Sequence, residues 1–345
     1  MSMLRNIRWA MVLVAGFYLI GCSNDRSSDG ATDGQPKKPK IAYVTNGVAP
    51  FWTIAEAGAK EGGKEFDADV EVLMPVEGIG HQKQMIEDLL TRGIDGIAVS
   101  PIDPANQIDL LDKAAAMVPL LTHDSDAPDS KRLVYIGMDN YDAGRMAGKL
   151  VKEAIPEGGK VVILVGRLEQ DNAKRRRQGV IDELLDRDSD SSRFDPPGKV
   201  LGEGGKYQVL ETLTDQFDRA KAKANAEDAI SKYQDLACMV GLFEYNPPLI
   251  IEALRLAGKG GKIKVVGFDE NATTLQAIID GECQGTIAQD PFMYGKKSVE
   301  VLSALHRGNT DLIPENKFID IPAQRIVKDN VEEFWTTLKT RLGEI

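Results

Sequence analysis

Carboxylate, carboxamide and aromatic side chains follow several short apolar runs of this sequence. The residues concerned are Phe51, Trp52, Asp124, Asn246, Asp269 and Gln289. A carboxylate accepts charge-assisted hydrogen bonds from hydroxyl groups, and a carboxamide both donates and accepts. Aromatic rings cover apolar C–H faces and exclude water from them. A sugar presents a ring of hydroxyls with C–H faces between them, so this set of groups is suited to binding one.

Other roles remain open for the same residues. Glycoside cleavage also uses two carboxyl groups, but it requires different pKa values at a fixed separation, which the sequence does not define. The aromatic residues could belong to the core, while Asp124, Asp269 and Asn246 could cap turns or helices. Gln289 could simply shape a hinge. Their shared position after apolar runs favours a binding site.

The apolar runs alternate with helical patterns from Lys40 onward, which is typical of βαβ units and mostly parallel sheets. The predicted strands are residues 40–45, 70–74, 96–100, 118–122, 133–137, 160–165, 200–204, 237–243, 262–268, 285–289 and 318–321. The predicted helices are residues 52–66, 82–92, 105–117, 143–154, 175–185, 219–233, 248–257, 273–280 and 294–307. One doubly wound sheet usually contains fewer strands than this, and we therefore predict two sheets. In open α/β sheets, ligands bind beyond the carboxyl ends of the strands, where the polar residues lie.

The first residues have the pattern of an export signal. Arg5 and Arg8 precede an apolar run over residues 9–20, and a helix of that length rises only ~18 Å, too little to span a bilayer core. We predict a signal peptide over residues 1–21. The segment ending at Cys22 resembles a bacterial lipobox, so Cys22 is predicted to carry a lipid. Residues 22–39 are rich in Ser, Gly, Asp and Pro and are predicted to form a flexible tether. An exported protein, lipid-anchored to a bacterial membrane in the periplasm or at the cell surface, is expected.

Composition excludes several classes of protein. The 345 residues include 53 Asp and Glu against 42 Lys and Arg, and the net charge of −11 argues against nucleic-acid binding. A hydrophobic content of 42% argues against general disorder and against a protein with many membrane spans. The acidic residues Asp186, Asp188 and Asp190 lack the glycine and glutamate that complete a calcium loop. No metal site and no cofactor is predicted.

From about Lys40 to Val327, the chain resembles periplasmic sugar receptors of the ribose-binding-protein type, which capture substrate for ATP-driven importers. The resemblance rests on an ordered set of motifs: Pro50-Phe51-Trp52, Thr122-His123-Asp124, Asn172-Ala173 with Arg176 and Gly179, Phe217-Asp218, Phe243 to Asn246, Val266-Gly267-Phe268-Asp269 and Thr286-Ile287-Ala288-Gln289. It implies a type I periplasmic-binding-protein fold, in which two Rossmann-like α/β lobes with parallel sheets are joined by a three-strand hinge.

The resemblance also implies a division of the chain. Residues 40–138 and 290–320 would form the N-terminal lobe, and residues 139–289 and 321–328 the C-terminal lobe. Residues 329–345 would add a helical tail. The crossovers between lobes are expected near residues 138–140, 289–291 and 321–323, with the sugar held in the cleft between the lobes.

The resemblance further implies roles for individual side chains. Phe51 and Trp52 would stack on one face of the sugar and Phe217 on the other, while Asp124 and Asp269 would accept hydrogen bonds from its hydroxyls. Asn246 and Gln289 would add amide contacts.

A cation from residues 174–177 would donate to a sugar oxygen. Arg176 has the spacing to Gly179 that fits best, and Lys174 is the alternative. The rest of this basic run is interpreted as a solvated helix face.

Two positions depart from the ribose-binding pattern. Ala49 stands where the family has Asn, and Ser125 stands where it has Arg. Losing a partner for a buried hydroxyl costs ~1–3 kcal/mol, enough to change which sugar is preferred. We therefore expect a monosaccharide whose identity stays open.

The expected function is that of a binding protein of an ABC-type importer. The lobes would close on the sugar, and a membrane permease would recognise the closed form. No covalent step is needed, so the protein is not expected to be an enzyme. It is expected to be a monomer. A sensor that presents its sugar to a signalling receptor and a secreted carbohydrate-active enzyme are the alternatives.

Overall fold

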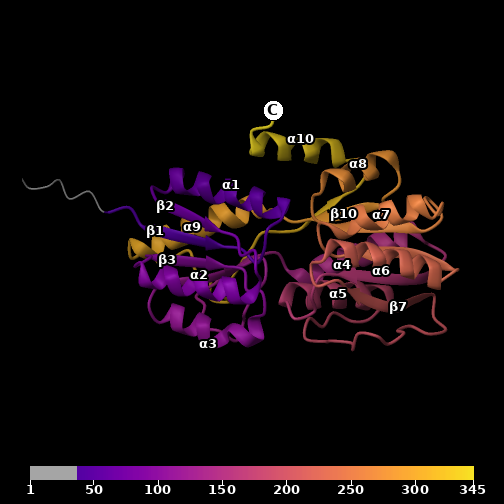
Figure 1. Ribbon diagram of the computed structural model, residues 1–345, viewed down its shortest axis with the longest axis horizontal. Helices are drawn as coiled ribbons and strands as arrows, with labels where there is room; N and C mark the ends of the chain where they lie inside the picture. Colours follow the sequence, from indigo (N-terminus) through magenta and orange to yellow (C-terminus); the bar gives the residue numbers. More distant parts are fainter. Residues whose placement is uncertain (1–36) are drawn as a thin grey trace, which may run out of the picture. The chain divides into compact units, whose positions relative to one another are not determined.

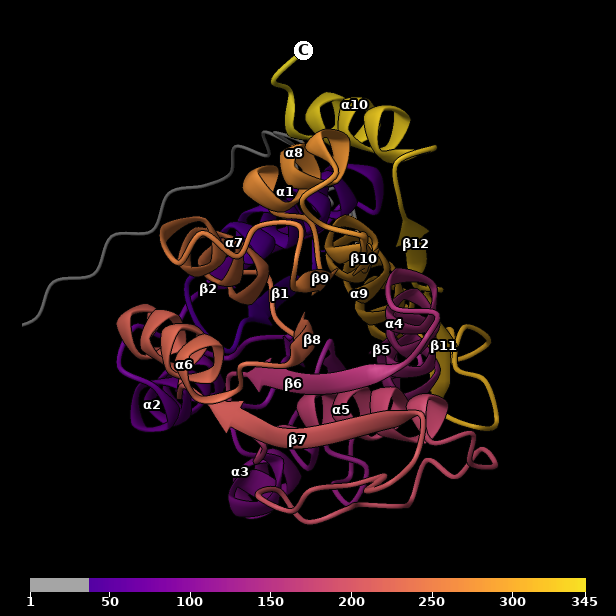
Figure 2. The same cartoon turned by 90° about the vertical axis from the view of Figure 1, so that its right-hand side faces the viewer.

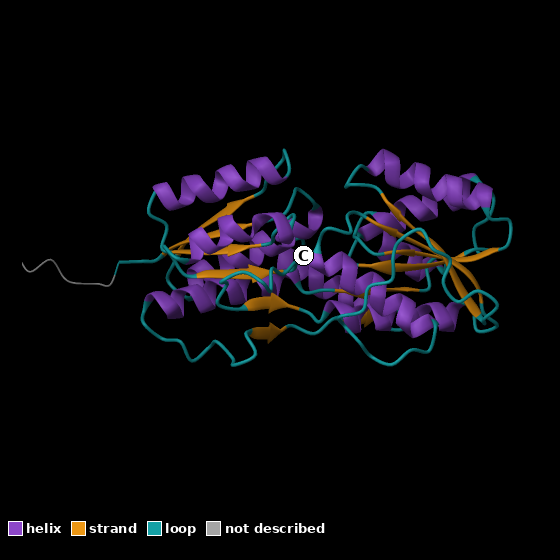
Figure 3. Ribbon diagram, turned by 90° about the horizontal axis from the view of Figure 1, so that it is seen from below, coloured by secondary structure: helices purple, strands orange, loops and turns teal. Residues whose placement is uncertain are grey.

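The computed structural model describes residues 37–345. The predicted signal peptide, Cys22 and the tether up to residue 36 lie outside the described residues. Over the described part, the chain forms two six-stranded sheets flanked by helices (Figures 1 and 3). The prediction of two α/β units with mostly parallel strands is therefore confirmed.

The first sheet is parallel throughout. Its strand order is β11 (Phe318–Asp320), β5 (Tyr135–Gly137), β4 (Leu120–His123), β3 (Gly96–Val99), β1 (Lys40–Val44) and β2 (Asp69–Leu73). Helices α1 (Pro50–Glu65) and α9 (Pro291–His306) cover one face, and α2 (Ile79–Thr91) and α3 (Pro104–Ala115) cover the other. Because helices cover both faces, β3 and β4 are buried along their whole length.

The second sheet has the corresponding strand order. It runs β12 (Gln324–Ile326), β10 (Gly285–Ala288), β9 (Lys264–Phe268), β8 (Leu236–Gly241), β6 (Gly159–Val165) and β7 (Tyr207–Thr214), and only β12 is antiparallel to its neighbour within residues 37–345. Helices α4 (Asn140–Ala154) and α5 (Asp171–Leu184) pack on one face. The other face is covered by α6 (Arg219–Lys232), α7 (Asn246–Leu256) and α8 (Ala272–Asp280) (Figure 2). We call each sheet with its helices a lobe.

Three segments join the two lobes. The chain leaves β5 for α4, leaves β10 for α9, and passes directly from β11 to β12. The last helix, α10 (Val331–Leu342), packs Phe334, Trp335 and Leu338 against the second lobe. Its Arg341 donates to both carboxylate oxygens of Asp290, at 2.9 and 2.8 Å. Asp290 caps the N-terminus of α9 in the first lobe, so α10 is attached to both lobes.

No helix among residues 37–345 combines the length and the apolar character that crossing a bilayer requires.

The predicted strand over residues 200–204 is wrong. Leu201 makes only an isolated bridge to Val209, and the strand itself is β7, from Tyr207 to Thr214. Gly202 and Gly204 have φ values of 74° and 76°, a left-handed conformation that forms a turn and cannot continue a strand. The short strand β12 was not predicted, because its three residues carry no distinct apolar pattern.

Helices α4 and α5 pack with their backbones in close contact. A Cβ atom on Gly144 of α4 would lie 2.2 Å from the carbonyl oxygen of Arg176, and one on Gly179 of α5 would lie 2.1 Å from that of Tyr141. Both helices therefore need glycine where they meet. This contact fixes the backbone of α5 at Arg176, a predicted site residue.

We expect Gly179→Ala to destabilise the protein by at least ~1–3 kcal/mol, because the added methyl group overlaps the backbone of α4. Urea unfolding measures the change. The matched control is Gly80→Ala on α2, where nothing lies within 4 Å of the new Cβ and a helical alanine should stabilise by ~0.5–1 kcal/mol. Equal stability of the two variants would contradict the packing argument.

Candidate ligand-binding site

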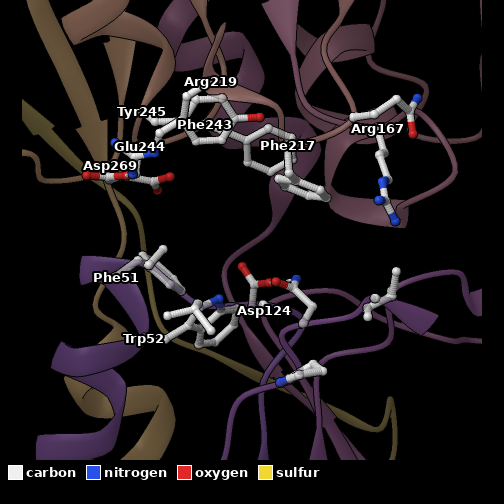
Figure 4. Close-up of a pocket in the computed structure, with 18 of the residues that line it drawn as sticks. Phe51, Trp52, Asp124, Arg167, Phe217, Arg219, Phe243, Glu244, Tyr245 and Asp269 are labelled. Carbon is white, nitrogen blue, oxygen red and sulfur yellow. Dashed lines mark hydrogen bonds and ion pairs between the residues drawn. The ribbon is translucent and has the colours of Figure 1, made fainter. Parts of the chain in front are cut away.

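A cavity of about 510 Å³ lies between the two lobes. The first lobe lines it with residues that follow β1, β2, β3 and β4, and the second with residues that follow β6, β7, β8, β9 and β10, together with Arg176 of α5. The cavity is thus at the carboxyl ends of parallel strands, as expected for an α/β architecture. Figure 4 shows its two walls facing each other.

Asp124 and Asp269 hold equivalent positions in the two lobes. Each directly follows its strand, β4 or β9, and each has a positive φ, 58° and 64° respectively. The amide of Asp124 donates to the carbonyl of Ile136 on the neighbouring strand, and that of Asp269 donates to Ile287. This left-handed turn of the backbone directs both carboxylates away from their sheets and toward the cavity, which both residues line.

Arg176 is fully buried between the lobes. Its Nε donates to the side-chain oxygen of Asn140 at 2.9 Å, and its Nη1 donates to the carbonyl of Leu242 at 3.2 Å. The guanidinium also lies over the rings of Phe268 and Phe243, 4.8 and 5.6 Å from their centroids. These contacts position the charge and partly offset the loss of water around it.

The guanidinium of Arg176 lies between the two aspartates. Nη2 is 3.6 Å from Oδ1 of Asp124, and Nη1 is 3.9 Å from Oδ2 of Asp269. Nη2 is buried and has no hydrogen-bond partner within residues 37–345. A buried donor without a partner is costly, so an acceptor atom entering the cavity would be favoured here.

Asp124 is held by groups from both lobes. Its Oδ2 accepts hydrogen bonds from Ser100 at 3.0 Å and from Asn46 and Asn172, each at 3.3 Å. Burial raises the pKa of Asp124 from 3.8 to about 6, and the charge of Arg176 opposes this increase. The carboxylate of Asp124 therefore takes up a proton at a higher pH than an exposed aspartate does.

Asp269 has fewer partners. Its Oδ1 accepts a hydrogen bond from Gln289 at 2.7 Å, and Gln289 in turn accepts one from the hydroxyl of Tyr294 at 3.1 Å. Burial raises the pKa of Asp269, and Arg176 again opposes the shift. The second oxygen, Oδ2, keeps its capacity to accept from a ligand.

Aromatic rings form both walls of the cavity. Phe51 and Trp52 lie on the first-lobe side in an edge-to-face pair with centroids 4.8 Å apart, and Phe217, Phe243 and Tyr245 lie opposite (Figure 4). Centroid distances within the second group are 5.6 to 6.4 Å. The two groups leave between them a space with apolar faces and polar groups at its inner end.

The cavity contains seven of the nine residues predicted to contact the ligand. They are Phe51, Trp52, Asp124, Arg176, Phe217, Asp269 and Gln289. Lys174 does not line the cavity, so Arg176 is the cation of residues 174–177 that does. Asn246 does not line it either. Its carboxamide donates to Asp215 at 3.0 Å and accepts from the amide of Phe243 at 3.1 Å, so it shapes the loop after β8.

The interpretation of residues 174–177 as a mostly solvated face is also wrong. Arg176 is fully buried, and Arg177 is only 1% exposed. Its guanidinium donates to the hydroxyl of Thr212 and the carbonyl of Asp195, each at 2.7 Å. The helical pattern of the sequence does not reveal these partners, because they come from β7 and a distant loop.

Several cavity residues were not predicted as ligand contacts. They are Asn46, Arg167, Gln216, Arg219, Phe243, Glu244 and Tyr245, among others. Arg167 follows the predicted strand 160–165, so the strand-end rule would have found it. Gln216 follows β7, which was predicted in the wrong place, so no such signal was available. Within residues 37–345, no cluster of three or more His, Cys, Asp or Glu side chains is arranged to hold a metal ion.

Comparison with known proteins agrees with this architecture. Residues 41–310 match the family model described as periplasmic binding protein domain. The chain belongs to this family. The match spans both lobes of this periplasmic binding protein and ends before α10.

Similar proteins include named sugar-binding components of importers. The ribose import binding protein of Bacillus subtilis is 26% identical over 261 residues, which cover 75% of this chain and 78% of that protein. The fructose import binding protein of Bifidobacterium longum is 25% identical over 345 residues, covering 95% and 98%. Among solved structures, an ABC transporter solute binding protein from Burkholderia graminis in complex with D-arabinose has a TM-score of 0.76 and 26% identity, covering 86% of this periplasmic binding protein and 97% of that chain.

The raised pKa of Asp124 predicts how stability changes with pH. The folded protein binds a proton at Asp124 below about 6, whereas the unfolded chain does so only below 3.8. The stabilisation from this proton is complete below the lower value and is lost as pH rises through the higher one. Without ligand, the wild type should gain stability relative to Asp124→Asn as pH falls from 7 to 4, by at most ~1.4 kcal/mol per pH unit.

Urea unfolding of both proteins across this pH range measures the difference. Titrating groups that do not interact with Asp124 cancel when the two free energies are subtracted. A difference that does not vary with pH would contradict a raised pKa at Asp124.

Proposed function

We propose that this periplasmic binding protein captures a monosaccharide for an ABC-type importer and holds it in the cavity between the lobes. The observation that carries the proposal is the arrangement around Arg176, where one buried guanidinium and two carboxylates from different lobes meet between aromatic walls. Acceptors, donors and apolar faces are the three kinds of surface that a sugar ring requires.

The free hydrogen-bonding capacity of the site suits hydroxyl groups. Oδ2 of Asp269 would accept from one hydroxyl, and Nη2 of Arg176 would donate to a ring or hydroxyl oxygen. Phe51 and Trp52 would cover one face of the ring and Phe217 the other. Asp124 would accept from a further hydroxyl in competition with its present donors, and Gln289 would orient Asp269.

Capture requires that the lobes move. We propose that residues 40–138 with 290–320, and residues 139–289 with 321–328, move as two units about the three connections. Ligand would favour the closed form, since only that form contacts it from both lobes. The closed form would then be recognised by a permease in the membrane. The helix α10, within residues 329–345, is attached to both units by the Arg341 and Asp290 pair and would limit how far they separate.

The relatives support this function. Their names describe import of ribose and of fructose, and a solved relative is in complex with D-arabinose. None of these names describes an enzyme, and capture requires no bond to form or break, so we propose binding without catalysis. Export, a lipid on Cys22 and action as a monomer complete the proposal.

A thermal-shift screen of pentoses, hexoses, deoxy sugars and polyols tests the function. A ligand at 100 times its dissociation constant should add ~2.7 kcal/mol of stability and raise the unfolding midpoint. Asp269→Asn should abolish this shift, because the carboxylate acceptor is lost, while the unliganded variant still unfolds cooperatively.

The control is Asp228→Asn, which changes an exposed aspartate on α6 of the same lobe. Its shift should match that of the wild type. Midpoints that no sugar raises, or equal shifts for both variants, would count against the proposal.

A further inference from the structure

Arg167 is a cation of the cavity that the proposed sugar contacts do not use. It follows β6 directly after Gly166, lines the cavity, and extends its side chain into the space between the walls (Figure 4). Its guanidinium lies 5.1 Å from the ring centroid of Phe217. Among residues 37–345, no carboxylate lies within ion-pair distance of Arg167, and its buried Nε has no hydrogen-bond partner.

The other two arginines of the cavity differ in this respect. Arg176 lies between Asp124 and Asp269, and Arg219 is 3.6 Å from Glu244. The described acids that line the cavity are these same three carboxylates. Arg167 is therefore the cavity's arginine whose charge no described acid neutralises.

The backbone around Arg167 is arranged to support its position. Gln216 and Phe217 have φ values of 60° and 64°, which are unfavourable for side chains of this size. A Cβ atom on Gly166 would lie 2.9 Å from the rings of Phe217 and Phe243. The hydrogen bond from the amide of Phe217 to Asp215, at 2.9 Å, holds the turn. Strain of this kind is maintained at binding sites, and here it places an aromatic ring against a free cation.

The acid on the described first-lobe wall is Asp124, which lies beside Arg176 and makes no ion pair with Arg167. The lining residues of this wall after β1 and β2 are uncharged, including Gly47, Val48, Pro75 and Val76. The chain as a whole carries a net charge of −11, which repels anions at long range. An unneutralised arginine in a cavity of such a protein indicates that the matching charge is on the ligand, because a guanidinium binds carboxylate and phosphate groups through paired hydrogen bonds.

We propose that the ligand is an anionic monosaccharide, whose hydroxyls meet Asp269 and Arg176 and whose acidic group meets Arg167. The inference rests on the proposed sugar-binding function and narrows its ligand class. A sugar carboxylate and a sugar phosphate share the required chemistry. Arg167 is then the residue that distinguishes acidic sugars from neutral ones.

Calorimetric titration of the purified full-length protein tests this. Matched ligands are glucose and galactose, the corresponding uronates, gluconate and glucose 6-phosphate. An acidic sugar should bind at least tenfold more tightly than its neutral counterpart, and the uronate and phosphate arms show which acidic group is preferred. In Arg167→Gln this preference should disappear, and Arg167→Lys should retain part of it, because the charge remains without the planar pair of donors.

The control variant is Arg255→Gln, which removes the same charge from an exposed position on α7 outside the cavity. It should keep the preference of the wild type. The preference should also weaken with added salt, as a charge pairing requires. Far-UV circular dichroism and unfolding midpoints establish that each variant is folded.

The outcomes separate the two proposals. If a neutral sugar binds as tightly as its acidic counterpart, or if Arg167→Gln keeps the preference, the inference about anionic ligands is wrong and the sugar-binding function stands. If no sugar of either kind binds, and none in the thermal-shift screen raises the unfolding midpoint, the proposed function is wrong and the inference fails with it.

Discussion

The burial of one positive charge governs the arrangement of this molecule. The guanidinium of Arg176 is fully removed from solvent, which is tolerated only where polar partners replace the lost water. Asp124 comes from the first lobe, whereas Asn140, the carbonyl of Leu242 and Asp269 come from the second. The charge thus links the lobes electrostatically. Its compensation is incomplete, because Nη2 has no hydrogen bond among the described residues, and this is where a ligand atom gains most.

The same constraint explains the protonation and the backbone of the aspartates. Burial raises the pKa of both Asp124 and Asp269, and the charge of Arg176 prevents a larger increase. Each carboxylate can face the arginine only because its backbone turns to a positive φ directly after the strand. Both lobes adopt this energetically unfavourable backbone conformation at equivalent positions. Burial and charge therefore converge on Arg176, Asp124 and Asp269, and the positive φ is found at the two aspartates. Such a combination is expected where a structure maintains a binding site.

Much of this could be predicted from the sequence, and the failures have common causes. Alternating apolar runs and helical patterns predict two sheets, and the strand-end rule finds Asp124 and Asp269. A helical pattern cannot tell which turn faces a partner that is distant in sequence. For this reason the burial of Arg177, which depends on Thr212 and Asp195, was missed. The strand predicted over residues 200–204 is misplaced, because the valine, leucine and glycine residues there form a turn. The strand-end rule therefore could not be applied to the residues that follow β7.

Position at a strand end does not by itself make a side chain available to a ligand. Asp215 and Asp269 both follow strands of the second sheet, both are buried, and burial raises the pKa of each. The oxygens of Asp215 already accept from Tyr245 at 2.5 Å, from Asn246 at 3.0 Å and from the amide of Phe217. Asp269 has one close donor, and its second oxygen is 3.9 Å from Arg176. Asp215 therefore holds the aromatic wall in place, and Asp269 keeps an oxygen that can accept a further hydrogen bond. Their partners, which only the folded chain brings together, determine which aspartate has its oxygens occupied and which one can still accept a hydrogen bond.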